Sequence, residues 1–151
     1  LLIDMPPGTG DVQLTMSQRV SLSGAIIVST PQDIALIDAK KGLKMFNKVN
    51  VPIIGIVENM SFYICPNCEA EAKIFGHGGA KQTSKDLSVD FLGEIPLDIN
   101  IRINSDKGLP NKTILEESNN AIYFDNISDK LIKFIQKLDQ DNIVDPIIKF
   151  E

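Results

Sequence analysis

The sequence predicts an α/β protein with a central parallel sheet. Short apolar runs alternate along the chain with segments of helical periodicity, which is the order that strand–helix–strand units produce. The apolar runs are hydrophobic at successive positions, as strands are when helices cover both faces of a sheet. With 151 residues and 43% hydrophobic content, the chain can form one domain around one core.

The first apolar run, residues 1–5, is expected to be a core strand that ends at a loop rich in Pro and Gly. A short helix is expected over residues 12–20, and a second buried strand over 24–30. The sequence opens inside an apparent strand, without an initiator Met or polar residues before it. We therefore expect the chain to be a fragment that lacks an N-terminal half.

The clearest helix is expected over residues 31–48, since Pro31 suits a first helical turn. The apolar residues that lie on or near one face of this helix are Ile34, Ile37, Leu43 and Phe46. The next strand is expected over residues 51–57, with Pro52 confined to its start.

The pattern breaks over residues 62–79, which we expect to form a loop. Beyond it the sequence predicts a helix over residues 80–87 and a strand over 89–95. An irregular stretch over residues 99–115 then precedes a long helix over 120–138. The apolar stripe of the long helix consists of Ile127, Leu131, Phe134, Ile135 and Leu138. We expect residues 1–138 to belong to a single domain and residues 139–151 to form a tail.

The loop that follows the first apolar run has the composition of a phosphate and magnesium site. Asp4 ends the run, at the edge of an open α/β sheet where ligands bind, and either contacts Mg²⁺ or caps a turn. Gly8 and Gly10 let backbone N–H groups approach a phosphate closely. Asn59, which follows another apolar run, either hydrogen-bonds an adenine edge or terminates a strand.

The phosphate loop Gly-x-x-x-x-Gly-Lys-Ser/Thr occurs nowhere in the 151 residues. That loop supplies the N–H cradle and the lysine that neutralise nucleotide phosphates. We therefore expect this chain alone not to hydrolyse ATP.

Cys65 and Cys68 form a C-x-x-C pair whose thiolates can chelate one metal centre. The alternatives are a redox dithiol, half of a zinc knuckle and two structural thiols. Iron–sulfur clusters and structural zinc both normally require four ligands, so a symmetric dimer would complete the set. His77 could be a third ligand, but a single loop histidine is more often an exposed imidazole.

Composition excludes several classes of protein. The net charge of −5 and the scattered basic residues argue against nucleic-acid binding. No apolar run approaches the ~20 residues that cross a bilayer, so we expect no membrane partner. Two cysteines do not make a secreted disulfide framework, which favours a reducing compartment.

In combination, these motifs closely resemble the Mrp/ApbC iron–sulfur carrier ATPases, in the MinD-like branch of deviant P-loop NTPases. The resemblance covers roughly residues 1–135, and no motif is decisive by itself. The motifs, in chain order, are residues 4–11 (DMPPGTGD), 30–33 (TPQD), 55–60 (GIVENM), 65–68 (CPNC), 75–79 (FGHGG) and 92–98 (LGEIPLD).

The resemblance implies a parallel-sheet P-loop NTPase fold, incomplete at the N-terminus, and a carrier that delivers a labile [4Fe–4S] cluster to apoproteins. It implies a homodimer through the C-x-x-C loop, with ATP and Mg²⁺ as cofactors of the intact protein. It also implies roles for single residues: Asp4 is the Walker B magnesium residue, and Gly8 is the switch residue near the γ-phosphate. Cys65 and Cys68 are the cluster ligands. The adenine side of the nucleotide pocket is formed by Asn59, Pro96, Leu97 and Asp98.

Two other functions remain open from the sequence. One is a MinD/ParA-like partitioning ATPase, although the mixed charges of residues 129–151 make a poor membrane anchor. The other is a zinc-stabilised binding module. We expect a cytoplasmic protein, with the mitochondrial matrix as the alternative.

Overall fold

Three parallel strands form the central sheet of the computed structural model, which describes residues 1–6, 8, 10–110, 112 and 118–140. β2 (Ile53–Asn59) lies between β1 (Ala25–Ser29) and β5 (Phe91–Ile95). Ile56 in β2 stands opposite Ile27 on one side and Phe91 on the other. The predicted α/β class with a parallel sheet is therefore confirmed.

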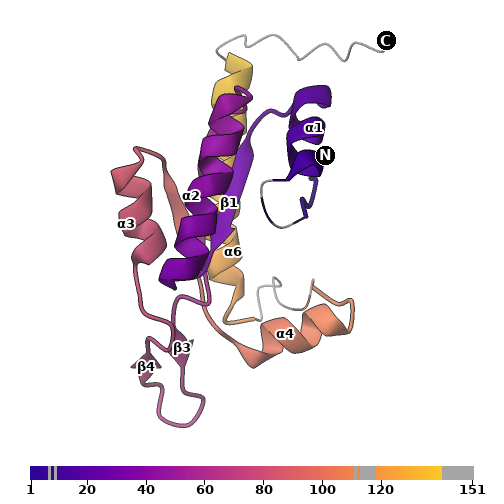
Figure 1. Ribbon diagram of the computed structural model, residues 1–151. Coiled ribbons are helices and arrows are strands. Elements are labelled where there is room, and N and C mark those ends of the chain that lie inside the picture. The colour runs from indigo at the N-terminus through magenta and orange to yellow at the C-terminus, as the bar shows by residue number, and fades with distance from the viewer. Residues whose placement is uncertain (7, 9, 111, 113–117, 141–151) are drawn as a thin grey trace.

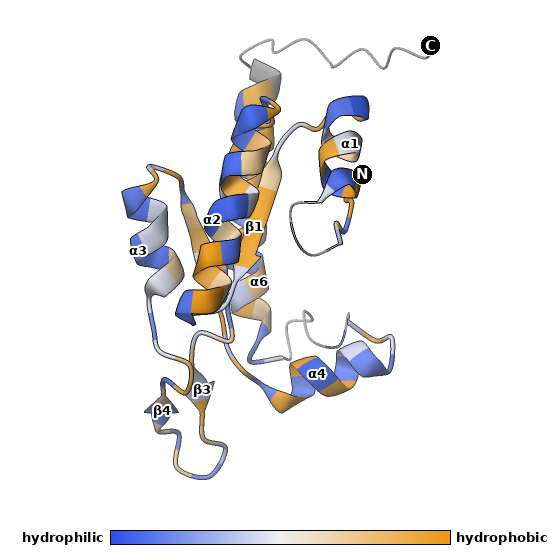
Figure 2. Ribbon diagram, viewed as in Figure 1, coloured by the Kyte–Doolittle hydropathy of each residue, from blue (hydrophilic) through white to orange (hydrophobic). Residues whose placement is uncertain are grey.

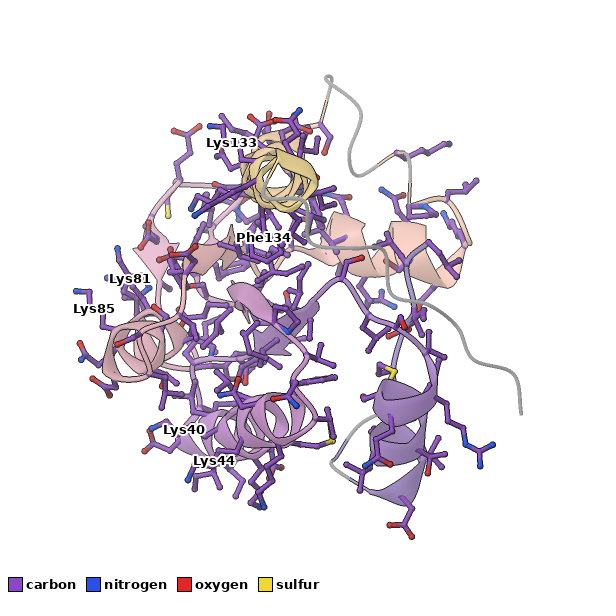
Figure 3. The ribbon with its side chains drawn as sticks, turned by 90° about the horizontal axis from the view of Figure 1, so that it is seen from above. Lys40, Lys44, Lys81, Lys85, Lys133 and Phe134 are labelled. Atoms are coloured by element: carbon purple, nitrogen blue, oxygen red, sulfur yellow. The ribbon has the colours of Figure 1, made fainter. Side chains whose placement is uncertain are left out.

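Helices cover both faces of this sheet, as Figures 1 and 3 show. On one face lie α2 (Asp33–Lys48) and α3 (Gly79–Asp86), and on the other lies α6 (Ala121–Gln140). Figure 3 shows Phe134 of α6 directed toward the sheet, while Lys133 points away from it. β1 is strongly hydrophobic in Figure 2, as expected of a strand that lies under helices.

Each face of the sheet has its own apolar core. Toward α2 and α3 the buried residues include Ala25, Ile27, Ile56, Leu36, Leu43, Phe46 and Ala80. Toward α6, Ile54, Val57 and Leu92 pack against Ile127, Leu131 and Phe134. Part of the stripe predicted for the last helix thus packs on the sheet, whereas Ile135 is 44% exposed.

The strand predicted over residues 1–5 is wrong. No strand forms there, and Leu1 and Leu2 are 114% and 87% exposed. An apolar run becomes a strand only where a neighbouring strand offers its backbone groups for pairing. Residues 1–5 do not pair with β1, whose only described neighbour is β2.

The helix predicted over residues 31–48 is confirmed as α2, but only part of its predicted apolar face is buried. Leu36, Leu43 and Phe46 are buried, whereas Ile34 and Ile37 are 72% and 50% exposed. Successive helical residues are turned by about 100°, so Ile37 lies a quarter turn or more from Leu36. The packing of α2 against the sheet and α3 decides which of the two neighbouring apolar positions is buried.

A hairpin of two strands and one helix, in segments predicted to be irregular, escaped the sequence analysis. β3 (Tyr63–Ile64) and β4 (Glu71–Ala72) form an antiparallel hairpin within residues 62–79, which projects beyond the sheet in Figure 1. α4 (Ile99–Asp106) lies in the stretch predicted as irregular. Both are too short to show a repeat in their hydrophobic pattern, which explains why periodicity missed them.

The remaining helices agree with the sequence to within a few residues. α1 (Asp11–Arg19) lies beside β1, and α3 and α6 match the helices predicted over residues 80–87 and 120–138. α6 continues to Gln140, and residues 141–151 of the predicted tail lie outside the described residues. No helix in the described part of the chain is long and apolar enough to cross a membrane.

Candidate functional site

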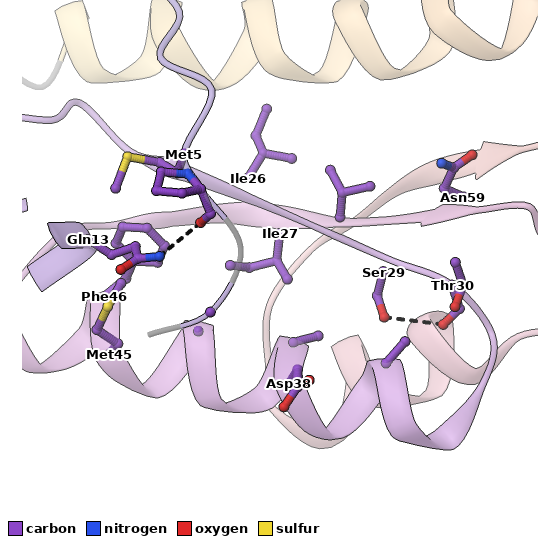
Figure 4. A pocket seen from close by; sticks show the side chains of 16 residues that line it. Met5, Gln13, Ile26, Ile27, Ser29, Thr30, Asp38, Met45, Phe46 and Asn59 are labelled. Carbon is purple, nitrogen blue, oxygen red and sulfur yellow. Dashed lines mark hydrogen bonds between the residues drawn. The ribbon is translucent and has the colours of Figure 1, made fainter. Parts of the chain in front are cut away.

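A hollow of about 510 Å³ runs along β1, between residues that precede α1 and the side chains of α2. Figure 4 shows Ile26 and Ile27 of β1 in its wall, together with Met45 and Phe46 of α2. Gln13 of α1 closes part of it, where its side-chain amide donates to the carbonyl of Pro6 at 3.0 Å. The wall is largely apolar, with polar groups at Thr30, Asp38 and Asn59.

The hollow contains two of the residues predicted to bind nucleotide, Gly8 and Asn59. Gly8 has a φ of +98°, a conformation that L side chains rarely adopt, and a Cβ there would meet no atom within 4 Å. Asn59 ends β2, and its side-chain oxygen accepts from the N–H of Met60 at 2.9 Å. Asp4 is exposed and does not line the hollow.

Pro96, Leu97 and Asp98 follow β5 and are not part of this hollow. Pro96 is buried, and the N–H of Leu97 donates to the carbonyl of Phe62 at 2.7 Å. The carboxylate of Asp98 accepts from the N–H of Asn100 at 2.6 Å and so caps the N-terminus of α4. Asp98 also lines a second, more polar hollow of about 580 Å³. Asn59 and Asp98 thus line two separate hollows, and Pro96 and Leu97 line neither of them.

Cys65 and Cys68 lie in the tight turn that joins β3 to β4. The N–H of Cys65 donates to the carbonyl of Ala70 at 3.0 Å, and the N–H of Glu69 donates to the carbonyl of Cys65 at 2.9 Å. Glu69 has a φ of +58°, which reverses the chain after the second cysteine. Both thiols are free, with Cys65 half-buried and Cys68 exposed. This turn leaves both sulfurs available to an external metal centre.

The same turn favours the thiolate form of Cys65. Hydrogen bonds from the backbone N–H of Asn67, then from the N–H and side chain of Cys68, lower the pKa of the Cys65 thiol, although burial opposes them. The thiolate is the form of cysteine that binds metals. The geometry therefore suits a metal-binding cysteine pair.

Glu58 is a fully buried carboxylate that the sequence analysis did not single out. Its Oε1 accepts from the hydroxyl of Ser61 at 2.6 Å and from the N–H of Gly78 at 3.0 Å, and its Oε2 accepts from the N–H of Ala80 at 2.7 Å. It thus connects the end of β2 to the start of α3. An acidic residue inside an apolar strand was the available signal, because a buried charge requires specific partners.

His77 is exposed but lies at the same junction. Its Nδ1 is 3.4 Å from the hydroxyl of Ser61, and ligand atoms of Glu58, His77 and Glu94 lie within 4.8 Å of one another. Three donors already occupy the carboxylate of Glu58. We therefore describe this group as a hydrogen-bonded junction rather than as a metal centre.

Comparisons with known proteins show the family and agree with the fold. A ParA family model, described as NUBPL iron-transfer P-loop NTPase, matches residues 1–132. The iron-sulfur cluster transfer protein NUBPL of Dictyostelium discoideum is 49% identical over 141 residues, which cover 93% of this chain and 44% of that protein. The iron-sulfur cluster carrier protein of Escherichia coli K12 is 50% identical over 131 residues, covering 87% and 36%.

Two solved structures share the fold. A nucleotide-binding protein from Archaeoglobus fulgidus, in complex with ADP, aligns with a TM-score of 0.65 and 38% identity over 72% of this chain and 44% of its own. The cell division ATPase MinD of Pyrococcus furiosus aligns with a TM-score of 0.56 and 23% identity over 74% and 43%. This second likeness shows the fold alone.

The chain therefore spans less than half the length of these relatives. The family match covers residues 1–132, most of the 151, and includes the C-x-x-C hairpin and the hollow beside β1. The chain belongs to the ParA family of NUBPL-type iron-transfer P-loop NTPases.

Proposed function

We propose that this chain is part of an iron–sulfur cluster carrier, and that Cys65 and Cys68 are its cluster ligands. The observation that carries the proposal is the hairpin turn, which holds two free thiols on the surface and favours the thiolate of Cys65. The named functions of the Dictyostelium and Escherichia coli relatives support it. The cargo is a labile [4Fe–4S] cluster delivered to apoproteins.

A homodimer through the hairpins supplies the remaining ligands. One chain offers two thiolates, and a four-iron cluster takes four, so two hairpins related by a two-fold axis complete the set. Ile64 and Ile74 flank the cysteines and are 44% and 56% exposed. Contact between two hairpins would remove this apolar surface from water.

Anaerobic reconstitution with iron and sulfide tests the cluster. We expect about four irons per dimer, with an equal amount of sulfide, and loss of both in the Cys65→Ser/Cys68→Ser variant. His77→Ala is the matched control for a third ligand and is expected to retain the iron. Iron that persists without the cysteines would contradict the proposal.

A zinc-stabilised binding module is the second candidate, because a turn with N–H groups directed at a thiolate also suits structural zinc. Metal analysis of anaerobically purified protein separates the two. Stoichiometric zinc that iron and sulfide do not replace would favour the module. Anaerobic handling is essential, since four thiolates also bind zinc after a cluster is lost.

Nucleotide is proposed to bind beside β1, with Asp4 serving Mg²⁺, Gly8 near the γ-phosphate and Asn59, Pro96, Leu97 and Asp98 on the adenine side. The hollow that Gly8 and Asn59 both line, and the ADP complex of the Archaeoglobus relative, support the roles of these two residues. Asp4, Pro96, Leu97 and Asp98 lie outside that hollow, and their roles rest on the resemblance to the family. Hydrolysis requires a phosphate loop, which the 151 residues do not contain. We expect no ATP hydrolysis by this chain, and hydrolysis that Asp4→Asn abolishes would contradict that expectation.

The proposed compartment is the cytoplasm, with the mitochondrial matrix as the alternative. A 56% identical relative from Arabidopsis thaliana is named as a mitochondrial iron-sulfur protein required for NADH dehydrogenase. Fractionation of cells that express the intact protein decides between the two.

A further inference from the structure

We propose that Glu58 is a positioning residue, which fixes the C-x-x-C hairpin to the end of β2 and thereby sets the metal affinity of Cys65 and Cys68. This inference rests on the proposed metal-binding function of the two cysteines. Neither the sequence pattern nor the family assignment gives Glu58 a role. The contacts of one buried carboxylate carry the argument.

Glu58 holds both ends of the hairpin segment. Ser61 lies where the chain enters the hairpin, and its hydroxyl donates to Oε1 at 2.6 Å. Gly78 lies where the chain leaves it, and its N–H donates to the same oxygen at 3.0 Å. One carboxylate oxygen therefore fixes the distance between the entry and the exit. The intervening residues include the whole hairpin and both cysteines.

The second carboxylate oxygen ties the exit to α3. Oε2 accepts from the N–H of Ala80 at 2.7 Å, within the first turn of the helix, where backbone N–H groups have no partner inside the helix. A negative charge at this end is also favoured by the helix dipole. Glu58 and Ala80 are each 0% exposed, so water cannot replace the carboxylate.

The entry side is attached to β5 as well. The N–H of Ser61 donates to the carbonyl of Ile95 at 3.0 Å, and the N–H of Leu97 donates to the carbonyl of Phe62 at 2.7 Å. The hairpin entry is therefore joined to β2 through Glu58 and to β5 through the backbone. Asn59, proposed to contact nucleotide, is the next residue after Glu58. Hydrogen bonds thus attach the hairpin entry to the ends of both strands.

The chemistry of this junction requires a carboxylate. All three groups that face Glu58 act as donors, and a carboxylate accepts at both oxygens. In Glu58→Gln, an NH₂ group replaces one of the two carboxylate oxygens. This NH₂ group is a donor, and it would face at least one N–H or O–H group that is also a donor. At least one of the three hydrogen bonds is then lost, although the side chain keeps its size.

The test is titration of the anaerobic chain with Co²⁺, whose thiolate absorption reports binding at the cysteines. We expect Glu58→Gln to weaken Co²⁺ affinity about tenfold or more, the range seen when groups that orient metal ligands are removed. Ser61→Ala, which removes only the entry contact, should have a smaller effect in the same direction. Asp90→Asn is the control, since it also removes one carboxylate, but from an exposed residue that precedes β5, at the opposite end of that strand from the Ile95 carbonyl at the hairpin entry.

Amide hydrogen exchange is measured on the same variants. We expect faster exchange in residues 63–80 of Glu58→Gln and Ser61→Ala, with protection of β1 and the centre of β2 retained. This pattern separates positioning from general loss of stability, which would speed exchange throughout the sheet. Ser61→Ala retains the buried carboxylate and two of its hydrogen bonds. If Glu58→Gln does not fold, Co²⁺ affinity and amide exchange of Ser61→Ala still test the proposal.

The outcomes distinguish the two proposals. Unchanged Co²⁺ affinity and unchanged exchange in both variants would overturn the role of Glu58 while leaving the metal site intact. An equal loss of affinity in Asp90→Asn would also overturn it. If Cys65→Ser/Cys68→Ser binds Co²⁺ as well as the parent chain, the proposed metal function fails, whereas exchange still tests whether Glu58 holds the hairpin.

Discussion

The backbone N–H of Cys65 donates to the carbonyl of Ala70 at 3.0 Å, so the chain reverses direction around the two cysteines. Only two residue pairs, Tyr63 with Ala72 and Ile64 with Glu71, continue the hairpin beyond this turn. So short a hairpin is marginally stable by itself. Its shape therefore depends on the turn and on the contacts at its base.

The first prediction concerns the reactivity of Cys65. The N–H groups of Asn67 and Cys68 lower the pKa of its thiol, so a larger fraction is thiolate at neutral pH than in an ordinary thiol of pKa about 8.5. In a Cys68→Ser variant, iodoacetamide alkylates only Cys65, and the alkylation rate should decrease as the pH is lowered. We expect the pH at which the rate is half its maximum to lie below about 8.5. A denatured sample of the same variant is the control. A midpoint no lower in the folded sample would contradict the prediction.

The second prediction concerns Glu69, whose φ of +58° is unfavourable for a residue with a side chain. Glycine adopts this conformation without the steric cost of about 1 kcal/mol, so Glu69→Gly should stabilise the metal-binding turn. We expect slower amide exchange across the hairpin. Glu71→Gly, two residues further on in β4, is the matched control and should have the opposite effect, because glycine weakens an extended strand. Equal effects at both positions would refute the explanation.

The third prediction compares two glycines of the core. A Cβ on Gly55 in β2 would lie 2.6 Å from the carbonyl oxygen of Asp90, and backbone there cannot move aside without disturbing β5. Gly55→Ala should lower the free energy of unfolding by about 1–3 kcal/mol in denaturant titration. A Cβ on Gly42 in α2 would meet only Ile27, at 3.9 Å. Gly42→Ala should be neutral or stabilising by up to about 1 kcal/mol, since alanine favours helices.

The fourth prediction concerns Lys130 of α6, whose ammonium group donates to the carbonyls of Phe91 and Leu92 at 3.0 and 2.8 Å. Lys130→Met keeps the apolar stem but leaves those two carbonyls without this donor, so the free energy of unfolding should fall by about 1–2 kcal/mol. Lys133→Met is the matched control, because Lys133 points away from the sheet in Figure 3. Its effect should stay within about 0.5 kcal/mol. A similar loss in both variants would show that the contact with β5 contributes nothing.

The sequence predicted the elements that are encoded by a pattern within a short stretch of consecutive residues. Apolar runs long enough to show their pattern identified β1, β2 and β5, and helical periodicity identified α2 and α6. The C-x-x-C spacing identified the metal-binding candidate before any geometry was known. Each of these signals is contained within a few consecutive residues, so no knowledge of distant contacts was needed.

Pairing between distant segments decided the rest. Residues 1–5 have the composition of a strand, but no described strand pairs with them. Ile34 and Leu36 are both strongly apolar, and the packing of α2 against the sheet and α3 determines that Leu36 is buried and Ile34 exposed. Pattern alone cannot choose between them, because burial depends on what packs against the helix.

The amino-acid sequence by itself determined the α/β class, the order of the main elements and the cysteine pair. The tertiary structure alone placed Gly8 and Asn59 in the wall of one hollow and left Asp4 outside it. It also brought Glu58 to Gly78 and Ala80, more than a dozen residues further along the chain. These contacts join groups whose separation in sequence carries no periodic signal, and they form only when β2, the hairpin and α3 pack together.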